Sequence, residues 1–261
     1  SLFKKKRGTD ETIKNGANLI TVADPKGPVT EQFRTIRTNI NFMAVDHDIK
    51  SVAFTSANIS EGKSTVAANV AVTYAQAGRK VLLIDADLRR PTVHRTFNLS
   101  NHVGLSTVIS STAKEVDLDD VVQDSGIADL AILPAGPTPP NPSELIGSKR
   151  MQDFISLVED HYDMVIIDLA PVLEVSDTQE LARRLDGIIL VVRQGKTQKA
   201  AIKRAVEMLN FSKAKVLGFI MNDISSDNAG YGYGYGYGYG YGYGYGEEDK
   251  KKKGFFSGRK K

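Results

Sequence analysis

Short apolar runs alternate with amphipathic segments along most of the chain. The apolar runs predict buried strands at 51–56, 80–85, 130–135, 163–168, 187–192 and 215–222. Helices are predicted over 29–45, 62–78 and 141–162, and near 176–185 and 197–211. Continuously apolar strands that alternate with amphipathic helices are typical of a parallel sheet covered on both faces. The pattern therefore predicts a doubly wound α/β fold, with a mostly parallel sheet and helices on both faces.

The helix over 141–162 carries a start signal. Asn141 stands at the cap position and Pro142 at the first helical position. Glu144 follows three residues after the cap, as in a capping box. These residues predict that the helix opens at Asn141.

The two ends of the chain differ from its middle. Residues 1–27 are polar and contain several glycines and prolines, so we expect a flexible N-terminal arm. Residues 28–224 hold the predicted strands and helices and are expected to form one domain. Residues 225–261 contain a Tyr-Gly repeat and a basic end. Because half of the repeat is glycine, it cannot bury enough surface to offset its ordering entropy, and we expect a flexible tail.

Composition and charge narrow the possible functions. The chain has no cysteine, which rules out a disulfide framework and fits a reducing compartment. No apolar run approaches the roughly 18–20 residues of a membrane-spanning helix, and no secretory signal is visible, so we expect a cytoplasmic chain. Both ends are basic while the part between them is net negative, which does not fit a nucleic-acid binder. The basic ends are either solvated tails or contacts with an anionic membrane surface.

The sequence SANISEGKST at 56–65 joins a predicted strand to a predicted helix, which is the context of a P-loop. Its backbone N–H groups can converge on phosphates at the positive end of the helix. Gly62 allows a close approach, Lys63 would reach the β- and γ-phosphates of ATP, and the Ser64 hydroxyl would hold Mg²⁺. The motif begins with Ala57 instead of glycine, which weakens the match but not its context. The predicted nucleotide-binding residues are Ser60, Glu61, Gly62, Lys63, Ser64 and Thr65.

Three aspartates lie at the ends of predicted strands. Asp85 and Asp87 lie in VLLIDADLRRP, and Asp168 lies in MVIIDLAP. Ligands of open α/β sheets bind outside the carboxyl ends of the strands, so we expect these acids to lie beside the P-loop. Acids placed there reach Mg²⁺ or its water shell. Arg89 and Arg90 either contact phosphate or pair with acids.

The combination of SANISEGKST, VLLIDADLRRP, MVIIDLAP and a C-terminal tyrosine cluster resembles the bacterial tyrosine kinases (BY-kinases). These autokinases accompany capsular and exopolysaccharide synthesis. The resemblance covers about residues 28–246 and extends to LPAGPTPPNPSELI at 133–146. It implies that Asp85 is the base toward the tyrosine hydroxyl, and that Asp87 and Asp168 lie around Mg²⁺.

The chain departs from the family pattern at two places beside the phosphates. Ile59-Ser60 stands where members usually have Pro-Gly. Leu169-Ala170 stands where they usually have Thr-Pro or a similar pair. Both departures bear on catalytic rate more than on nucleotide binding.

The resemblance also implies partners. EQFRTIRTNI is similar to the family's E-x-x-R-x-x-R helix, which builds a ring of subunits. Glu31, Arg34 and Arg37 would then contact a neighbouring subunit; the local alternative is charge pairs on an exposed helix face. The chain is similar to the separate cytoplasmic type of kinase, which implies a membrane-anchored activator whose cytoplasmic end recruits it and completes the site. Asn222, at the end of the last predicted strand, either meets the adenine base or caps the strand.

The tyrosine cluster supplies candidate phosphoacceptors. Eight of the ten tyrosines alternate with glycine: Tyr231, Tyr233, Tyr235, Tyr237, Tyr239, Tyr241, Tyr243 and Tyr245. A glycine-rich coil of about 14 residues spans about 20 Å, so the tail can enter a neighbouring subunit's cleft. Eight phosphates would add about −12 to −16 charges, and repulsion among the tails should then convert a ring to monomers.

The leading hypothesis is thus an ATP- and magnesium-dependent protein-tyrosine autokinase. The alternative is a P-loop switch ATPase of the partitioning and division-site type, without kinase activity. That group carries a signature lysine at the position of Asn58, and its absence here favours the kinase. A structural or adhesive protein whose tail is its function would have no need of Lys63.

Overall fold

The computed structural model describes residues 15–43, 48–112 and 117–223. Contacts divide the chain after Ile224, and the second unit, Ser225–Lys261, lies outside the described residues. The candidate phosphoacceptor tyrosines and the predicted tail belong to that second unit. Residues 1–14 of the predicted arm also lie outside the described residues. The domain boundaries stay predictions.

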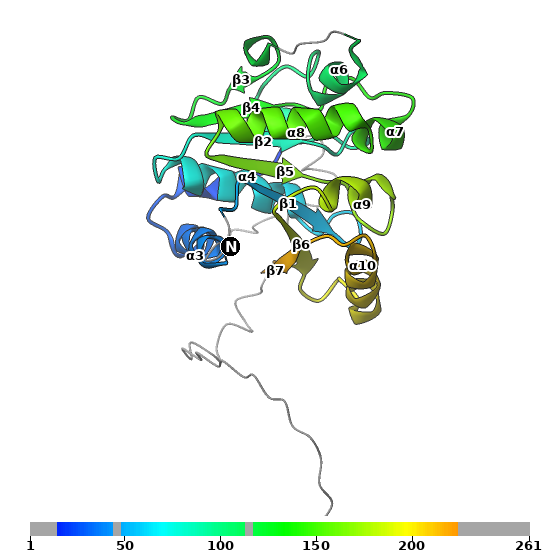
Figure 1. Cartoon of the computed structure of the whole chain (residues 1–261). Coiled ribbons are helices and arrows are strands. Elements are labelled where there is room, and N and C mark those ends of the chain that lie inside the picture. The colour runs from blue at the N-terminus through cyan, green and yellow to red at the C-terminus, as the bar shows by residue number, and fades with distance from the viewer. Residues whose placement is uncertain (1–14, 44–47, 113–116, 224–261) are drawn as a thin grey trace, which may run out of the picture. The chain divides into compact units, whose positions relative to one another are not determined.

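A sheet with the strand order β3-β4-β2-β5-β1-β6-β7 lies at the centre of the described part (Figure 1). Its strands are β1 (Ser51–Ser56), β2 (Val81–Asp85), β3 (Gln123–Asp124), β4 (Leu130–Leu133), β5 (Met164–Asp168), β6 (Gly187–Arg193) and β7 (Val216–Asn222). All neighbouring pairs run parallel except β3 and β4, which run antiparallel. The predicted mostly parallel sheet is confirmed, and the two-residue β3 was not predicted.

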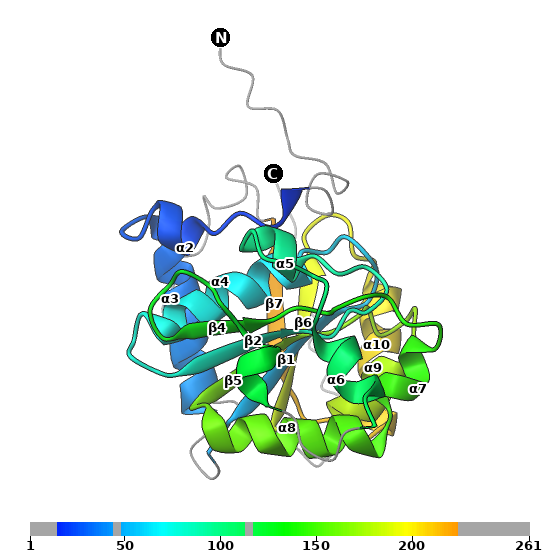
Figure 2. The same ribbon diagram turned by 90° about the horizontal axis from the view of Figure 1, so that it is seen from above.

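Helices cover both faces of this sheet (Figures 1 and 2). They are α2 (Ile20–Ala23), α3 (Pro28–Phe42), α4 (Lys63–Ala75), α5 (Val93–Thr96), α6 (Leu105–Ser110), the 3-10 turn η1 (Leu118–Asp120), α7 (Pro142–Ile146), α8 (Lys149–His161), α9 (Asp177–Ala182) and α10 (Lys199–Phe211). Helices α3 and α4 share one apolar cluster with the sheet, and α8, α9 and α10 share the other. Every residue of β1, β2 and β5 is therefore buried. Within the described ranges, no helix combines the length and apolar character needed to cross a membrane.

The helix predicted over 141–162 is wrong as a continuous element, because it is split into α7 and α8. The Ser148 hydroxyl accepts a hydrogen bond from the Met151 N–H at 3.1 Å and so caps a new helix. Asn141 makes no side-chain cap to the backbone. Its amide instead donates to the Glu144 carboxylate at 2.8 Å. A second capping residue inside the segment thus starts a new helix, while α7 begins directly after Asn141, as predicted.

The described part of the predicted arm is folded. Thr21 on α2 is buried, and its N–H and hydroxyl donate to the Asn69 side-chain oxygen at 3.1 and 2.9 Å. The Asn69 amide donates to the carbonyls of Asn18 and Thr65, both at 2.9 Å. The prediction of a flexible arm is therefore wrong for residues 15–27. Asn69, a buried residue on α4, thus makes several of the hydrogen bonds that hold this segment.

Candidate functional site

The P-loop joins β1 to α4. Gly62 stands just before α4 with a φ of 92°, a left-handed conformation that favours glycine. A side chain at this position would also collide with the amide of Asn222, at the end of β7. Ser60 has a positive φ of 66° as well. The first N–H groups of α4 have no acceptor within the helix, so this end offers donors and a positive dipole to a phosphate.

The side chain of Glu61 is buried and holds the P-loop from within. One carboxylate oxygen accepts hydrogen bonds from the N–H groups of Ala57 at 3.0 Å and Asn58 at 3.3 Å. The other accepts from the Thr197 hydroxyl at 2.7 Å. The Asn222 amide donates to the Glu61 carbonyl at 3.0 Å. Both side chains therefore fix the shape of the loop, a role that the sequence did not reveal.

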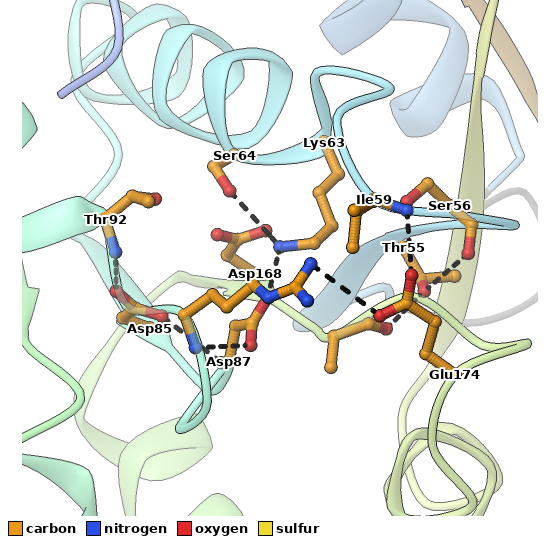
Figure 3. Close-up of polar contacts among 12 residues, drawn as sticks. Thr55, Ser56, Ile59, Lys63, Ser64, Asp85, Asp87, Thr92, Asp168 and Glu174 are labelled. Carbon is orange, nitrogen blue, oxygen red and sulfur yellow. Dashed lines mark hydrogen bonds and ion pairs between the residues drawn. The ribbon is translucent and has the colours of Figure 1, made fainter. Parts of the chain in front are cut away.

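Lys63 lies between two of the aspartates (Figure 3). Its Nζ is 2.9 Å from Asp87 Oδ2, 3.2 Å from Asp168 Oδ1 and 3.3 Å from Ser64 Oγ. Burial acts to lower the pKa of Lys63, but the carboxylates of Asp168 and Asp87 outweigh it and hold the pKa above its ordinary value. Lys63 therefore stays charged and balances the acids around it.

The register of the sheet brings the acids together. Asp85 ends β2, Asp168 ends β5, and the two are paired in register. Strand β5 also pairs with β1, which leads directly into the P-loop. The carboxyl ends of three adjacent parallel strands thus meet at one edge, as expected from the sequence.

Asp85 is fully buried, and both of its carboxylate oxygens accept backbone hydrogen bonds. Oδ2 accepts from the N–H groups of Thr92 and Val93, both at 3.0 Å, and Oδ1 accepts from the Asp87 N–H at 3.2 Å. Burial, reinforced by the charges of Asp168 and Asp87, raises the pKa of Asp85 to about 8. Burial likewise raises the pKa of Asp168. Asp85 orders the loop that carries Asp87, and its role as a base stays a prediction.

The side chains here fit Mg²⁺, because Ser64, Asp87 and Asp168 offer the oxygen ligands that this ion prefers. Asp168 Oδ2 is buried, and it has no hydrogen-bond partner among the residues described. No group of three or more His, Cys, Asp or Glu residues in these ranges forms a metal cage. Mg²⁺ is usually held by one or two carboxylates together with substrate phosphates. The residues present therefore suit an ion that arrives with a nucleotide.

Sequence reasoning missed Glu174, in the loop after β5. One oxygen accepts a hydrogen bond from the Ile59 N–H in the P-loop at 3.3 Å. The other is 3.8 Å from Nη1 of Arg90, so this arginine pairs with an acid. Arg89 donates to the Ser143 hydroxyl on α7 at 2.8 Å. Glu174 belongs to no motif, so only the fold could identify it.

Arg193, at the end of β6, was missed too. Its Nη1 donates to the Ser60 carbonyl at 3.0 Å, and its Nε and Nη2 are each 2.9 Å from Asp223 Oδ2. The residue that follows β7 is thereby linked to the P-loop.

The residues predicted for a subunit interface lie on α3 and contact their own chain. Arg34 pairs with Glu31 and donates to the Pro25 carbonyl at 2.8 Å. Arg37 donates to the Thr73 carbonyl on α4. The local charge pair is therefore present, and the subunit contact stays a prediction.

Comparison with known proteins gives consistent matches over most of the chain. A family model described as an AAA domain matches residues 49–216. The tyrosine-protein kinase YwqD of Bacillus subtilis is 50% identical over 205 residues, which cover 78% of this chain and 85% of that protein. The kinase domain of the Escherichia coli tyrosine kinase ETK has a TM-score of 0.76 at 31% identity, covering 91% of this chain and 89% of that one. The chimerical protein CapA2B2 has a TM-score of 0.74 at 38% identity, covering 82% and 98%.

Proposed function

The chain belongs to the bacterial tyrosine kinases, and we propose that it uses Mg-ATP to phosphorylate its own tyrosine cluster at 231–245, in trans between copies. Its P-loop fold is that of a nucleotide-binding kinase domain. The observation that carries the proposal is the placement of Lys63 between Asp87 and Asp168 at the phosphate end of the P-loop.

Each side chain of the site has a proposed role in the transfer. Lys63 contacts the β- and γ-phosphates, and the N–H groups at the start of α4 hold them. Ser64, Asp87 and Asp168 would hold Mg²⁺, which neutralises phosphate charge when bound. Asp85 is the proposed base toward the tyrosine hydroxyl. Once deprotonated, a carboxylate with a raised pKa is a stronger base than an ordinary one.

We also propose that copies assemble into a ring through Glu31, Arg34 and Arg37. The Arg34–Glu31 pair is partly exposed, so it is weakly held and can exchange for a subunit partner. The proposed enzyme is cytoplasmic, and an activator protein recruits it to the membrane, where it regulates capsular or exopolysaccharide synthesis. The basic ends of the chain would add contact with an anionic membrane surface.

Mass spectrometry after incubation with Mg-ATP tests the proposal, with and without a peptide from the cytoplasmic end of an activator. We expect phosphate on tyrosines within 231–245 in the native chain and none in Lys63→Met. Lys196→Met is the matched control, because Lys196 is an exposed lysine beyond β6, and it should retain phosphorylation. A chain that binds and hydrolyses ATP but forms no phosphotyrosine would instead be a switch ATPase.

Light scattering tests the assembly. We expect the unphosphorylated chain to form an oligomer, and the phosphorylated chain to be monomeric, because eight phosphotyrosines per tail repel one another. A fully phosphorylated sample that remains oligomeric would show that tail charge does not control assembly.

A further inference from the structure

Glu174 connects the loops that follow three adjacent strands. It lies after β5, its contact Ile59 follows β1, and its contact Arg90 follows β2. The backbone of its loop is fixed on the P-loop, since the Val172 N–H donates to the Ser56 carbonyl at 2.9 Å and the Leu173 N–H to the Ala57 carbonyl at 3.3 Å. The Glu174 carboxylate is therefore anchored at the rim of the phosphate site.

The Ile59 contact of Glu174 is part of the P-loop itself (Figure 3). The Arg90 N–H donates to Asp87 Oδ1 at 3.1 Å, and Asp87 in turn contacts Lys63. Arg90 thus shares a short loop with an acid of the phosphate site, and its guanidinium points to Glu174.

The contact with the P-loop is made to its backbone. The Ile59 N–H donates to the Glu174 carboxylate. A proline at this position would have no N–H to donate, so the link between Glu174 and the P-loop depends on the residue at position 59.

The link to Arg90 is suited to exchange. The two side chains are 48% and 36% exposed and their charged atoms are 3.8 Å apart, so the pair is weak. A terminal phosphate is a stronger partner for a guanidinium, because it carries more negative charge and has oxygens free for bidentate hydrogen bonds, whereas one oxygen of Glu174 already accepts from the Ile59 N–H. An arriving triphosphate can therefore take Arg90 away from the carboxylate.

We propose that Glu174 is a positioning residue that holds Arg90 at the rim of the phosphate site, and that Arg90 passes from Glu174 to the terminal phosphate of a bound nucleoside triphosphate. A diphosphate lacks that phosphate and leaves the pair intact. Glu174 thereby sets how strongly the site prefers ATP to ADP. This inference rests on the proposed function, because it assumes that the P-loop binds ATP.

A double-mutant cycle of Glu174→Gln and Arg90→Gln tests the inference. Glutamine keeps an oxygen for the Ile59 N–H and removes only the charge that pairs with Arg90. Affinities for ADP and for a non-hydrolysable ATP analogue are measured with Mg²⁺ by calorimetry, and the ATP dependence of phosphorylation is followed in parallel. Glu180→Gln is the control, because Glu180 pairs with Arg183 at 3.3 Å on α9 with similar exposure.

We expect Glu174→Gln to tighten binding of the ATP analogue about two- to fivefold, the range of an exposed ion pair, and to leave ADP unchanged. Its KM for ATP should fall by the same factor. Arg90→Gln should weaken the analogue about fivefold or more and abolish the effect of Glu174→Gln. The control should match the native chain.

Equal effects of Glu174→Gln on ADP and on the analogue would overturn the inference. An effect of Glu174→Gln that persists beside Arg90→Gln would overturn it too. So would a Glu174→Gln variant that binds the analogue like the native chain, when that native chain binds ATP and phosphorylates tyrosine. A native chain that fails to bind ATP would instead overturn the proposed function, and this inference with it.

Discussion

Replacing Glu61 by alanine is expected to open the P-loop, whereas glutamine should preserve it. Alanine leaves the N–H groups of Ala57 and Asn58 and the hydroxyl of Thr197 without their acceptor. Glutamine keeps the shape, because its oxygen can accept from the two N–H groups while its NH₂ donates to the Thr197 oxygen. The two variants therefore separate the shape of the side chain from its charge.

The size of the effect follows from burial. Ala57 is 1% exposed, so its N–H cannot form a hydrogen bond with water instead. Leaving this N–H unpaired lowers the stability of the fold by about 1–3 kcal/mol. Asn58 and Thr197 are half-buried, and water can replace part of their loss. We expect Glu61→Ala to lower the free energy of unfolding by about 2–3 kcal/mol, and Glu61→Gln by about 1 kcal/mol or less. The former corresponds to about 4–12 °C in Tm for a domain of this size.

Nucleotide affinity should fall as well. Ordering a released residue costs about 1–2 kcal/mol, so a loop freed at Ala57 and Asn58 should bind ADP about 30-fold more weakly or worse. Glu61→Gln should bind ADP within about threefold of the native chain.

Urea denaturation gives the unfolding free energies, and calorimetry with ADP gives the affinities. Glu207→Ala serves as a control, since Glu207 forms an exposed ion pair at 3.9 Å to Lys203 on α10, away from the P-loop. If Glu61→Gln weakened ADP binding as much as Glu61→Ala, the charge of Glu61 would matter and not its contacts within the loop. That result would refute the reasoning.

Three further predictions concern the folded domain. Asn69→Ala removes the partners of Thr21 and should lower the free energy of unfolding by about 2–4 kcal/mol in urea; a loss below about 1 kcal/mol would mean that the segment is held otherwise. The pKa of Asp85 is about 8 in the folded chain and about 3.9 in an unfolded one, so the folded chain keeps a proton that the unfolded chain loses, and stability falls as pH rises through this window. Asp85→Asn should therefore gain stability relative to the native chain between pH 5 and pH 8 in urea titrations, and an equal difference at both pH values would contradict the shift. Ser148→Ala should cost about 1 kcal/mol by the same method, because the N–H of Met151 loses its cap; no change would mean that α8 begins without this contact.

The parts of the fold that the sequence predicts well have local signals. The strand that ends in Asp85 and the one that ends in Asp168 are each a continuous apolar run, and both faces of the sheet are covered. The P-loop residues from Gly62 to Ser64 follow a strand and open a helix. The periodicity of the apolar residues and the position of the motifs at strand ends are enough to place such residues at one edge of a parallel sheet.

The parts that could not be predicted depend on pairs far apart in the chain. Thr21 is fixed by Asn69, and nothing near either residue indicates the other. Glu174 and Arg193 look like ordinary charged residues until the fold brings them to the P-loop. Ser148 is different, because its capping ability is local: α7 begins after Asn141, as predicted, and α8 begins after Ser148.

The register of the paired strands fixes the distances between the acids of the proposed chemistry. Asp168 is paired with Asp85 on one side and with Phe54 on the other, just before the P-loop. Distances across these paired strands change only in whole-residue steps, and a one-residue slip turns every side chain of a strand to the opposite face. A single insertion within β2 should therefore abolish the site, while insertions in surface loops away from it are tolerated. Evolution can adjust this kinase by exchanging side chains at fixed positions, but it cannot slide the acids gradually past one another.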